Sequence, residues 1–520
     1  MPKARLCRTA EILKLTRRCD ILCQHALRRP CVVVDLCPCV AHLPPPLRRN
    51  QACLRIGIPQ RTNSRTNLRT NDIMAESPPT TLNDLAAKIT ELTETLSRFL
   101  TDNSIPEPSF AADSPTSYTG LTAESFMVRQ ALFDALMDMI YLTQGPSESI
   151  FNFVHTCMPD AASLNVLNYF DFWAAVPLDG SASYDDIAKH TDLPREVVRR
   201  VIEHATTLRL FAPTEPGKAE TRIRHTSRSA ALSKNAGLRA LVSTLLDDAG
   251  PPMTVLPEAL RQYTTGKPEL TTDMNETSFA LFHRHGVFGE YATPWDLLEN
   301  DGSGEKKGWR QRNFVEFMRY LKDIFQLEKV MLECYDWKAA GKATVVDVGG
   351  SAGHDSVVLA QNFPDLSITV QDLGQVKPAY EANVPQELKA RVRFMEHSFF
   401  DPQPVRADVY LLKLILHDWP DAESIQILRG LVPAMKAGSR VIFIDYVGKH
   451  GDSEGAPLPR SIQAMGTATD MRMMALFNAK ERPVEEWKGI FQAADSRFEI
   501  VRTKADPLTF MVVIEAVLRE

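Results

Sequence analysis

The sequence predicts an α/β fold for residues 338–520 and a mainly helical region before it, over residues 121–337. From about residue 342, short apolar runs such as "TVVDVGG" and "RVIFIDYV" alternate with helical segments. This alternation is typical of a mostly parallel sheet. Over residues 121–337, apolar residues recur mainly at helical spacing. The change of pattern sets the predicted domain boundary, and a chain of 520 residues has room for two or three domains.

Residues 1–73 differ from the rest of the chain in composition. They carry 14 basic residues against 4 acidic ones, whereas the remaining chain carries 45 basic and 61 acidic residues. Seven of the nine cysteines also lie there. An Arg-rich transit peptide, a metal or disulfide module, and non-native sequence upstream of a working start at Met74 all fit this composition. The cysteine spacings lack the paired half of a zinc site, and we favour a basic, Cys-rich leader that is disordered or non-native.

The rest of the chain has the composition of a globular protein. Hydrophobic residues make up 44% and charged residues 24%, which are ordinary values. The chain contains no apolar run of the roughly 18 residues that a membrane span needs, so we expect no membrane association. Since only two cysteines follow residue 73 and no secretory signal is recognisable, we expect a cytoplasmic protein.

Residues 74–120 are predicted to contain an amphipathic helix, over residues 80–100, and then a loose linker rich in Pro, Ser and Thr. The next region, from residue 121 to about residue 180, again has a helical pattern. The segment "ENDGSGEKKG", residues 299–308, is predicted to be an exposed loop that interrupts the helical pattern.

A winged helix-turn-helix is predicted within the helical region. Its expected elements are three helices, over residues 166–180, 181–193 and 194–211, and a hairpin over residues 210–226. Such a module can bind DNA through its third helix, or it can serve packing and dimerisation. The third helix mixes Arg and Glu and the chain after residue 73 is acidic, whereas a DNA-binding face is usually basic. We therefore expect no nucleic-acid partner.

A glycine turn follows the first strand of the predicted sheet. Gly349 and Gly350 in "DVGGSAGHDS" allow a tight turn and close approach of a ligand, although a purely structural turn has the same signature. The segment lacks both the dinucleotide pattern and the phosphate-binding loop pattern. Asp372 ends the second strand, where an acid can accept hydrogen bonds from ribose hydroxyls. Glycine turn and acid together predict a nucleoside ligand without phosphates, and S-adenosyl-L-methionine is the natural candidate.

The segments "DVGGSAGHDS", "ITVQDL", "LLKLILHDWPD" and "NAKERP" together resemble the class I O-methyltransferases of the caffeate and fungal polyketide type, over about residues 120–520. The resemblance implies a Rossmann-like, seven-stranded methyltransferase sheet preceded by a helical winged-helix domain that forms a homodimer. It also implies methyl transfer from S-adenosyl-L-methionine to a phenolic hydroxyl of an aromatic, polyketide-derived secondary metabolite. The implied cofactor contacts are Gly349, Gly350, Asp372, Ser398, Phe399 and Lys413. Ser398 stands in "HSFF" where the family commonly has an acid that hydrogen-bonds toward the adenine end of the cofactor. Two outcomes stay open: the Ser398 hydroxyl makes this hydrogen bond instead, or cofactor binding is weaker.

His417, just after the fourth strand, is the predicted catalytic residue. A phenol has a pKa of about 10, so at neutral pH it needs a base to remove its proton. Alone, a His at a strand end is more often structural; the glycine turn, Asp372 and the resemblance favour catalysis.

Two later acids are expected to orient the His417 imidazole. A catalytic imidazole needs an acceptor for its other nitrogen. Asp445, at the end of the fifth strand, and Glu481 suit this role, and the family carries acids at both positions. Asp445 is one methylene shorter than the Glu of the plant enzymes, so its reach is limited. Asp418 is expected to cap the following helix.

The predicted substrate pocket is apolar. A cluster of Met residues in "TDMRMMALFNAK" is more often core than pocket, but the resemblance places Met473 against an aromatic ring. It also implies that Phe314, Met318 and Asp470 contact the substrate. The sequence contains no metal-ligand pattern, and we expect no metal. Two other functions stay open, a DNA-binding regulator and a degenerate methyltransferase that acts as a partner protein.

Overall fold

The computed structural model describes residues 80–118, 120–284, 286, 289–300, 307–446, 459–506 and 511–520. The chain separates into two units, Met1–Ser77 and Pro78–Glu520, and every described element belongs to the second unit. The leader expected over residues 1–73 lies outside the described residues and stays a prediction. In the described part of the chain, no helix is both long and apolar enough to span a membrane.

The first described helix, α2 (Leu82–Asp102), confirms the amphipathic helix predicted from the sequence. Thr81 caps it: the Asp84 N–H donates to the Thr81 side chain at 3.2 Å, and the Asp84 carboxylate accepts the Thr81 N–H at 2.9 Å. The described residues between α2 and the next helix form no helix or strand, as expected for a linker. Two long helices follow, α3 (Ala123–Gln144) and α4 (Pro146–Tyr169).

The winged-helix order is confirmed in its second and third helices and its hairpin. These are α6 (Tyr184–Thr191), α7 (Arg195–Thr207), and strands β1 (Phe211–Pro213) and β2 (Ile223–His225), which pair antiparallel. The prediction of a first helix over residues 166–180 is wrong. Helix α4 ends at Tyr169, Asp171 adopts a left-handed backbone (φ 50°), and only the short α5 (Phe172–Ala175) follows. The turn brings Trp173 into the core, where it stacks on Phe211.

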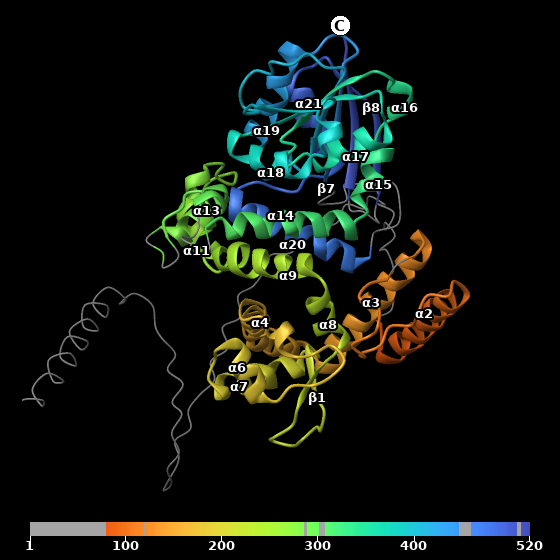
Figure 1. Ribbon diagram of the computed structural model, residues 1–520, viewed down its shortest axis with the longest axis vertical. Coiled ribbons are helices and arrows are strands. Elements are labelled where there is room, and N and C mark those ends of the chain that lie inside the picture. The colour runs from red at the N-terminus through yellow and green to blue at the C-terminus, as the bar shows by residue number, and fades with distance from the viewer. Residues whose placement is uncertain are drawn as a thin grey trace, which may run out of the picture. The chain divides into compact units, whose positions relative to one another are not determined.

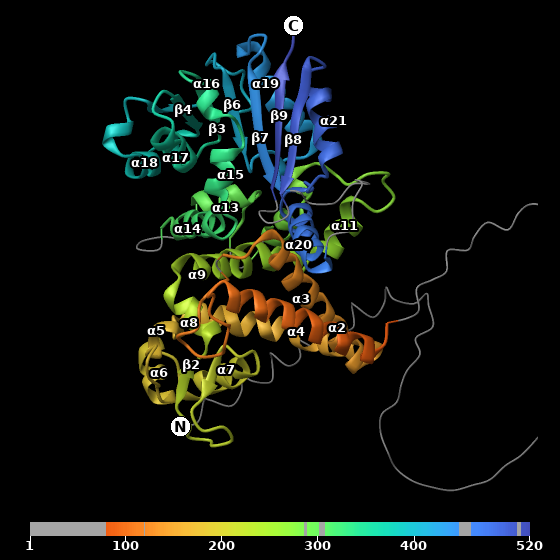
Figure 2. The same ribbon diagram turned by 90° about the vertical axis from the view of Figure 1, so that its right-hand side faces the viewer.

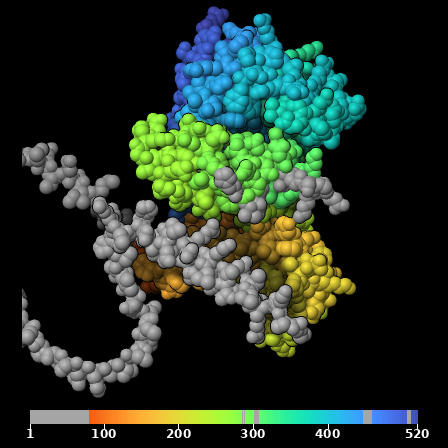
Figure 3. All heavy atoms as spheres, turned by 90° about the vertical axis from the view of Figure 1, so that its left-hand side faces the viewer, coloured from red at the N-terminus to blue at the C-terminus, as the bar shows by residue number. Residues whose placement is uncertain are grey.

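Helices fill the region between the winged helix and the sheet, and Figure 3 shows much of this region as the green layer between the blue and yellow parts. They are α8 (Ser227–Lys234), α9 (Ala236–Ser243), the π-helix η1 (Thr244–Ala249), α10 (Gly250–Met253), α11 (Leu256–Tyr263), η2 (Met274–Glu276), α12 (Ser278–His283), α13 (Pro294–Asn300) and α14 (Trp309–Ile324). Helices α15 (Leu327–Glu333) and α16 (Trp337–Ala340) follow and pack against the sheet. Helices α9 and α14 lie side by side (Figure 1). Gly237 permits this approach, because a Cβ there would lie 2.6 Å from the Tyr320 Cβ.

A seven-stranded sheet forms the C-terminal part, as predicted (Figure 2). Its order is β5-β4-β3-β6-β7-β9-β8, and β9 alone runs antiparallel to its neighbours. The strands are β3 (Thr344–Val348), β4 (Ser367–Asp372), β5 (Val392–Glu396), β6 (Val409–Lys413), β7 (Arg440–Tyr446), β8 (Phe498–Asp506) and β9 (Met511–Leu518). The helices of this part are α17 (His354–Asn362), α18 (Lys377–Asn383), α19 (Asp421–Leu431), α20 (Arg460–Phe477) and α21 (Val484–Ala494), with the 3₁₀ turns η4 (Gly374–Val376), η5 (Gln386–Leu388), η6 (Leu416–Asp418) and η7 (Val432–Ala434).

The sheet is buried on both faces, which explains why its strands read as apolar runs. Alternate strand residues point to opposite sides. Val345 and Leu411 pack with α15 and α17 in one core, and Val346 and Leu412 pack with α19 and α21 in the other. The carboxyl ends of β3, β4 and β6 therefore meet at one edge of a rigid sheet, where open α/β folds bind ligands.

Candidate active site

The glycine turn after β3 is tightly packed against its surroundings. A Cβ on Gly350 would lie 2.5 Å from the Asp347 Cγ, and a Cβ on Gly349 would lie 2.7 Å from the Ile415 Cδ1. Gly349 also has φ +69°, which favours glycine. A Cβ at position 350 would displace the buried Asp347 carboxyl, and the positive φ of Gly349 disfavours a side chain there, so the local structure favours glycine at both positions.

Asp372 closes this turn. Its carboxylate accepts the Ser351 N–H and the Leu373 N–H, each at 2.8 Å. Burial raises the pKa of Asp372, and the two backbone hydrogen bonds oppose that rise. The sequence-predicted acid thus lies beside Gly349 and Gly350, as their positions on neighbouring strands implied.

Lys413, at the end of β6, makes a half-buried ion pair. Its Nζ lies 2.6 Å from Asp355 Oδ2, and the other oxygen of Asp355 has no hydrogen-bond partner among the described residues. The sequence did not single out Asp355. Ser398 follows β5, where its hydroxyl accepts the Phe400 N–H at 3.3 Å. Phe399 packs edge-on against Trp419 with ring centroids 5.8 Å apart.

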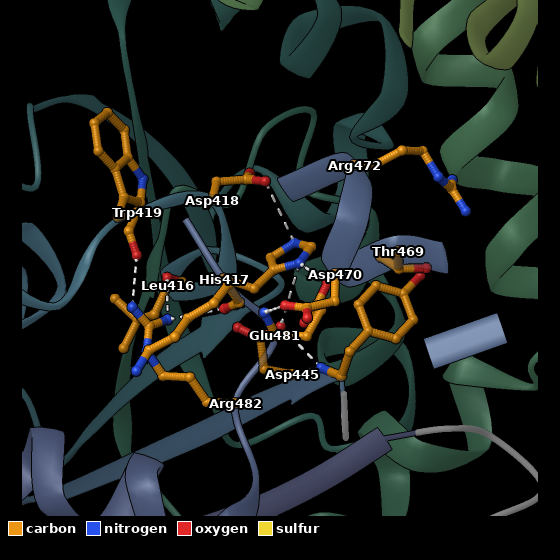
Figure 4. Close-up of polar contacts among 12 residues, drawn as sticks. Leu416, His417, Asp418, Trp419, Asp445, Thr469, Asp470, Arg472, Glu481 and Arg482 are labelled. Carbon is orange, nitrogen blue, oxygen red and sulfur yellow. Dashed lines mark hydrogen bonds and ion pairs between the residues drawn. The ribbon is translucent and has the colours of Figure 1, made fainter. Parts of the chain in front are cut away.

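His417 lies in η6, at the same sheet edge, with three carboxyl groups around its ring (Figure 4). The Nδ1 atom is hydrogen bonded to Glu481 Oε1 at 3.0 Å and lies 3.9 Å from Asp445 Oδ1. The Nε2 atom lies 3.6 Å from Asp418 Oδ1. The structure thus brings together the three residues that the sequence predicted to be catalytic. Only Glu481 comes within hydrogen-bonding distance of Nδ1, and the shorter Asp445 side chain stays outside it.

Asp418 does not cap a helix, so that prediction is wrong. Helix α19 begins at Asp421 with Pro420 at its N-cap and no side-chain cap. The 3₁₀ turn instead directs the Asp418 carboxyl toward His417, although the two residues adjoin in sequence. Asp418 is therefore a fourth member of the charged cluster.

The proton affinities of this cluster are strongly perturbed. Burial lowers the pKa of His417, but Asp445, Asp418 and Glu481 outweigh it, and the net pKa lies well above its usual value. Burial raises the pKa of Asp445 to about 7 and that of Asp418 to about 6, against the opposing effect of His417. Desolvated carboxyls around one imidazole share protons in this way, and such groups concentrate at functional sites.

Two consecutive residues tie the loop before α21 to the His417 turn. Glu481 contacts the imidazole, and its backbone N–H donates to Asp470 Oδ1 at 2.9 Å. Arg482 is fully buried and donates to Asp421 Oδ1 at 2.6 and 2.8 Å and to the Trp419 carbonyl at 2.9 Å. Asp470 therefore positions Glu481, and it is not among the residues that line the cavity described next.

A cavity of about 310 Å³ opens beside the cluster. His417, Phe314, Met318 and Met473 line it, as predicted, and Met473 also packs in the core. Its walls come from α9, η1, α13, α14 and α20, and most of its lining is apolar. The sequence missed other lining residues, namely Asp248, Trp295, Tyr446 and Arg472. Their type and spacing gave no signal, because the packing of α13, α14 and α20 decides which side chains face the cavity.

The atoms of His417, Asp445 and Glu481 that could ligate a metal ion lie within 4.8 Å of one another. This donor set is compatible with a divalent ion, but it equally suits proton exchange between an imidazole and carboxylates. The expectation that no metal is involved stays a prediction.

Comparison with known proteins identifies the family. Residues 303–497 match the O-methyltransferase domain. The chain is 42% identical to the O-methyltransferase lcsG of Purpureocillium lilacinum, over 85% of this chain and 95% of the relative, and 31% identical to the O-methyltransferase aoiF of Aspergillus oryzae, over 84% and 99%. The structure of OxaC in complex with SAH and oxaline has the same fold, with a TM-score of 0.63, 21% identity, and coverage of 84% of this chain and 100% of that one. The LepI structure with SAM gives a TM-score of 0.61 at 20% identity, with the same coverage. This chain therefore belongs to the S-adenosylmethionine-dependent O-methyltransferases of the fungal secondary-metabolite type.

Proposed function

We propose that this enzyme methylates a phenolic hydroxyl of an aromatic metabolite, with His417 as the general base. The observation that supports this best is the setting of the imidazole. His417 lines an apolar cavity, and Glu481 engages Nδ1, so Nε2 is the nitrogen available to a substrate. Apolar and aromatic walls such as Phe314 and Met318 suit a flat ring.

The cofactor site proposed for S-adenosylmethionine is the edge formed by Gly349, Gly350, Asp372, Phe399 and Lys413. The two glycines make a tight turn at this sheet edge, and the Asp372 carboxylate accepts the Ser351 N–H within it. Asp372 can accept hydrogen bonds from ribose hydroxyls, and Asp355, paired with Lys413, keeps one oxygen without a partner in the described part of the chain. These features fit a nucleoside ligand. Ser398 offers a hydroxyl where relatives carry an acid.

The proton is handled by the chain's own residues. When bound, S-adenosylmethionine supplies a methyl group on a sulfonium. His417 is placed to take the phenol proton on Nε2, so that the phenol oxygen could accept the methyl group that the bound cofactor would supply. Glu481 and Asp445 stabilise the imidazolium that forms, and Glu481 fixes the ring orientation.

The test is the His417→Ala variant, assayed for methyl transfer to a panel of phenols, anthraquinones and xanthones. We expect turnover to fall by about 10²- to 10⁴-fold, the usual contribution of a general base. Calorimetry should show that S-adenosylmethionine binds nearly as in the wild type. His190→Ala is the control, because His190 is exposed on α6. Turnover near the wild-type value in His417→Ala would overturn the assignment of His417 as the base. A wild-type protein that binds no S-adenosylmethionine would indicate a degenerate enzyme.

We also propose that the enzyme is a homodimer. Helix α4 exposes an unusual number of large apolar side chains, each more than 60% accessible: Ile150, Phe151, Phe153, Val154 and Met158. Contiguous exposed apolar surface marks protein interfaces, and the family resemblance assigns dimerisation to this region. Sedimentation should give a dimer for the wild type and a monomer for Phe153→Asp/Val154→Asp. A monomeric wild type at micromolar concentration would contradict the proposal.

We propose no DNA-binding role for the winged helix. Arg195 in α7 pairs with Asp185 and Glu220, and Arg199 pairs with Glu203. These arginines are already neutralised, whereas a DNA-binding helix needs a basic face free to meet phosphates.

A further inference from the structure

Arg472 places a cation in the wall of the otherwise apolar cavity. It lies on α20 among the lining residues, and its side chain is partly buried. Its Nε donates to the Ala468 carbonyl, one turn back in the same helix, at 3.3 Å. No ion pair joins its guanidinium to a carboxylate in the described residues. Most of the hydrogen-bonding capacity of this guanidinium is therefore unused.

The other charges that line the cavity are compensated. Asp248 pairs with Arg310, and both side chains are 13% exposed. The carboxyls of Asp418 and Glu481 surround His417. Arg472 is thus the one cation of the lining that the described residues leave without an anionic partner.

An aromatic substrate would change the surroundings of Arg472. The cavity walls include Leu241, Leu245, Phe279 and Leu476, none of which has a side chain that can accept a hydrogen bond. Filling the cavity with an aromatic ring expels water from the guanidinium, and a charged donor left without an acceptor is costly. Burial already lowers the pKa of Arg472, a shift that Tyr446 and Glu481 oppose. A substrate that fits this cavity should supply an acceptor.

We propose that Arg472 binds a carboxylate on the aromatic substrate and thereby selects aromatic hydroxy acids over their neutral analogues. The guanidinium fork matches a carboxylate with two parallel hydrogen bonds. A carboxyl group is ionised at neutral pH, whereas a second phenol, with a pKa of about 10, is mostly neutral. In Figure 4 the Arg472 side chain extends away from the His417 ring, so the carboxylate lies away from the hydroxyl that reacts. The inference rests on the proposed function for the aromatic substrate and for the position of methyl transfer.

The test measures equilibrium binding and does not require turnover. A set of isomeric hydroxynaphthoates and the methyl ester of each would be titrated calorimetrically into protein saturated with S-adenosylhomocysteine. We expect the wild type to bind at least one acid about ten- to hundred-fold more tightly than its ester, the range of a hydrogen-bonded charge. Arg472→Met should abolish this preference, and Arg472→Lys should keep part of it. Arg261→Met is the matched control, because Arg261 pairs with Glu258 on the exposed face of α11.

Two results would overturn the proposal: a wild type that prefers no acid of the set, or a preference that survives in Arg472→Met. Thermal unfolding of each variant separates misfolding from lost recognition, and Arg472→Lys keeps the test valid if the Met variant is unstable. Selective binding of acids without methyl transfer to any phenol would refute the proposed function and leave the role of Arg472 standing.

Discussion

Replacing Glu481 by Gln should move the pH dependence of methyl transfer to lower pH. The substitution keeps the size of the side chain and removes one charge from the cluster around His417. A general base must be neutral to act, so kcat/KM rises as the pH passes the pKa of His417. Because the carboxylates raise that pKa, removing one of them lowers it, and the rise then occurs at lower pH.

The distances show why Glu481 is the acid to change. At an effective dielectric constant of about 20, opposite unit charges attract by about 6 kcal/mol at the 3.0 Å of Glu481 and by about 4 kcal/mol at the 3.9 Å of Asp445. Asp445 is also partly protonated near neutrality, since its pKa is raised to about 7. We therefore expect the midpoint to fall by at least about one pH unit in Glu481→Gln, and by less in Asp445→Asn.

The assay is kcat/KM for methyl transfer to the best phenol of the panel, measured from pH 5 to 10. The plateau should also fall by about tenfold or more, because an amide at position 481 no longer fixes one tautomer of the ring. Glu485→Gln is the control, since Glu485 pairs with Lys488 on the surface of α21. A midpoint that is unchanged or higher in Glu481→Gln would refute the idea that this carboxylate sets the proton affinity of His417.

The remaining predictions concern the turn, a buried acid and metal dependence. Gly350→Ala should abolish S-adenosylmethionine binding in calorimetry, because the new Cβ would meet Asp347. The control is Gly489→Ala in α21, where the space is open and the substitution should raise stability by up to about 1 kcal/mol. Normal cofactor binding by Gly350→Ala would contradict the packing argument. Asp347 is buried, and burial is the main reason that its pKa is raised to about 7. Its contribution to the free energy of unfolding is therefore full below pH 3.8. As the pH rises through 7, about 4 kcal/mol of this contribution is lost. The stability of Asp347→Asn relative to the wild type should therefore increase from pH 4 to pH 8, as measured by denaturant unfolding. A stability difference that stays constant over this range would argue against a raised pKa of Asp347. EDTA should leave methyl transfer unchanged, because the imidazole and its acids suffice to move the proton; a loss that Mg²⁺ or Zn²⁺ restores would assign the cluster to a metal.

The sheet could be predicted from the sequence because strands buried on both faces are continuous apolar runs. The same logic located Asp372, His417 and Asp445, since the carboxyl ends of parallel strands converge on one edge. Glu481 follows no strand and came from the family resemblance. For Asp372, His417 and Asp445, the position at the end of a strand determined the place in space.

Features that depend on packing between distant segments could not be predicted. No residue pattern predicts the helix break after Tyr169, because the break depends on burying Trp173 against Phe211. From the sequence, Asp418 is predicted to be a helix cap, because the residue types around it do not predict the 3₁₀ turn that directs its carboxyl toward His417. Arg472 faces the cavity only because α20 packs where it does.

The double anchor of Glu481 and Arg482 has a consequence for how such enzymes diversify. Glu481 is hydrogen bonded to the His417 imidazole, and Arg482 donates to the Trp419 carbonyl. These contacts tie residues 478–483 to residues 416–421. Much of the cavity wall comes instead from residues 241–325, which do not share those contacts. Mutations can therefore accumulate in the wall, and new aromatic shapes can be accepted, while the proton-transfer apparatus is inherited unchanged.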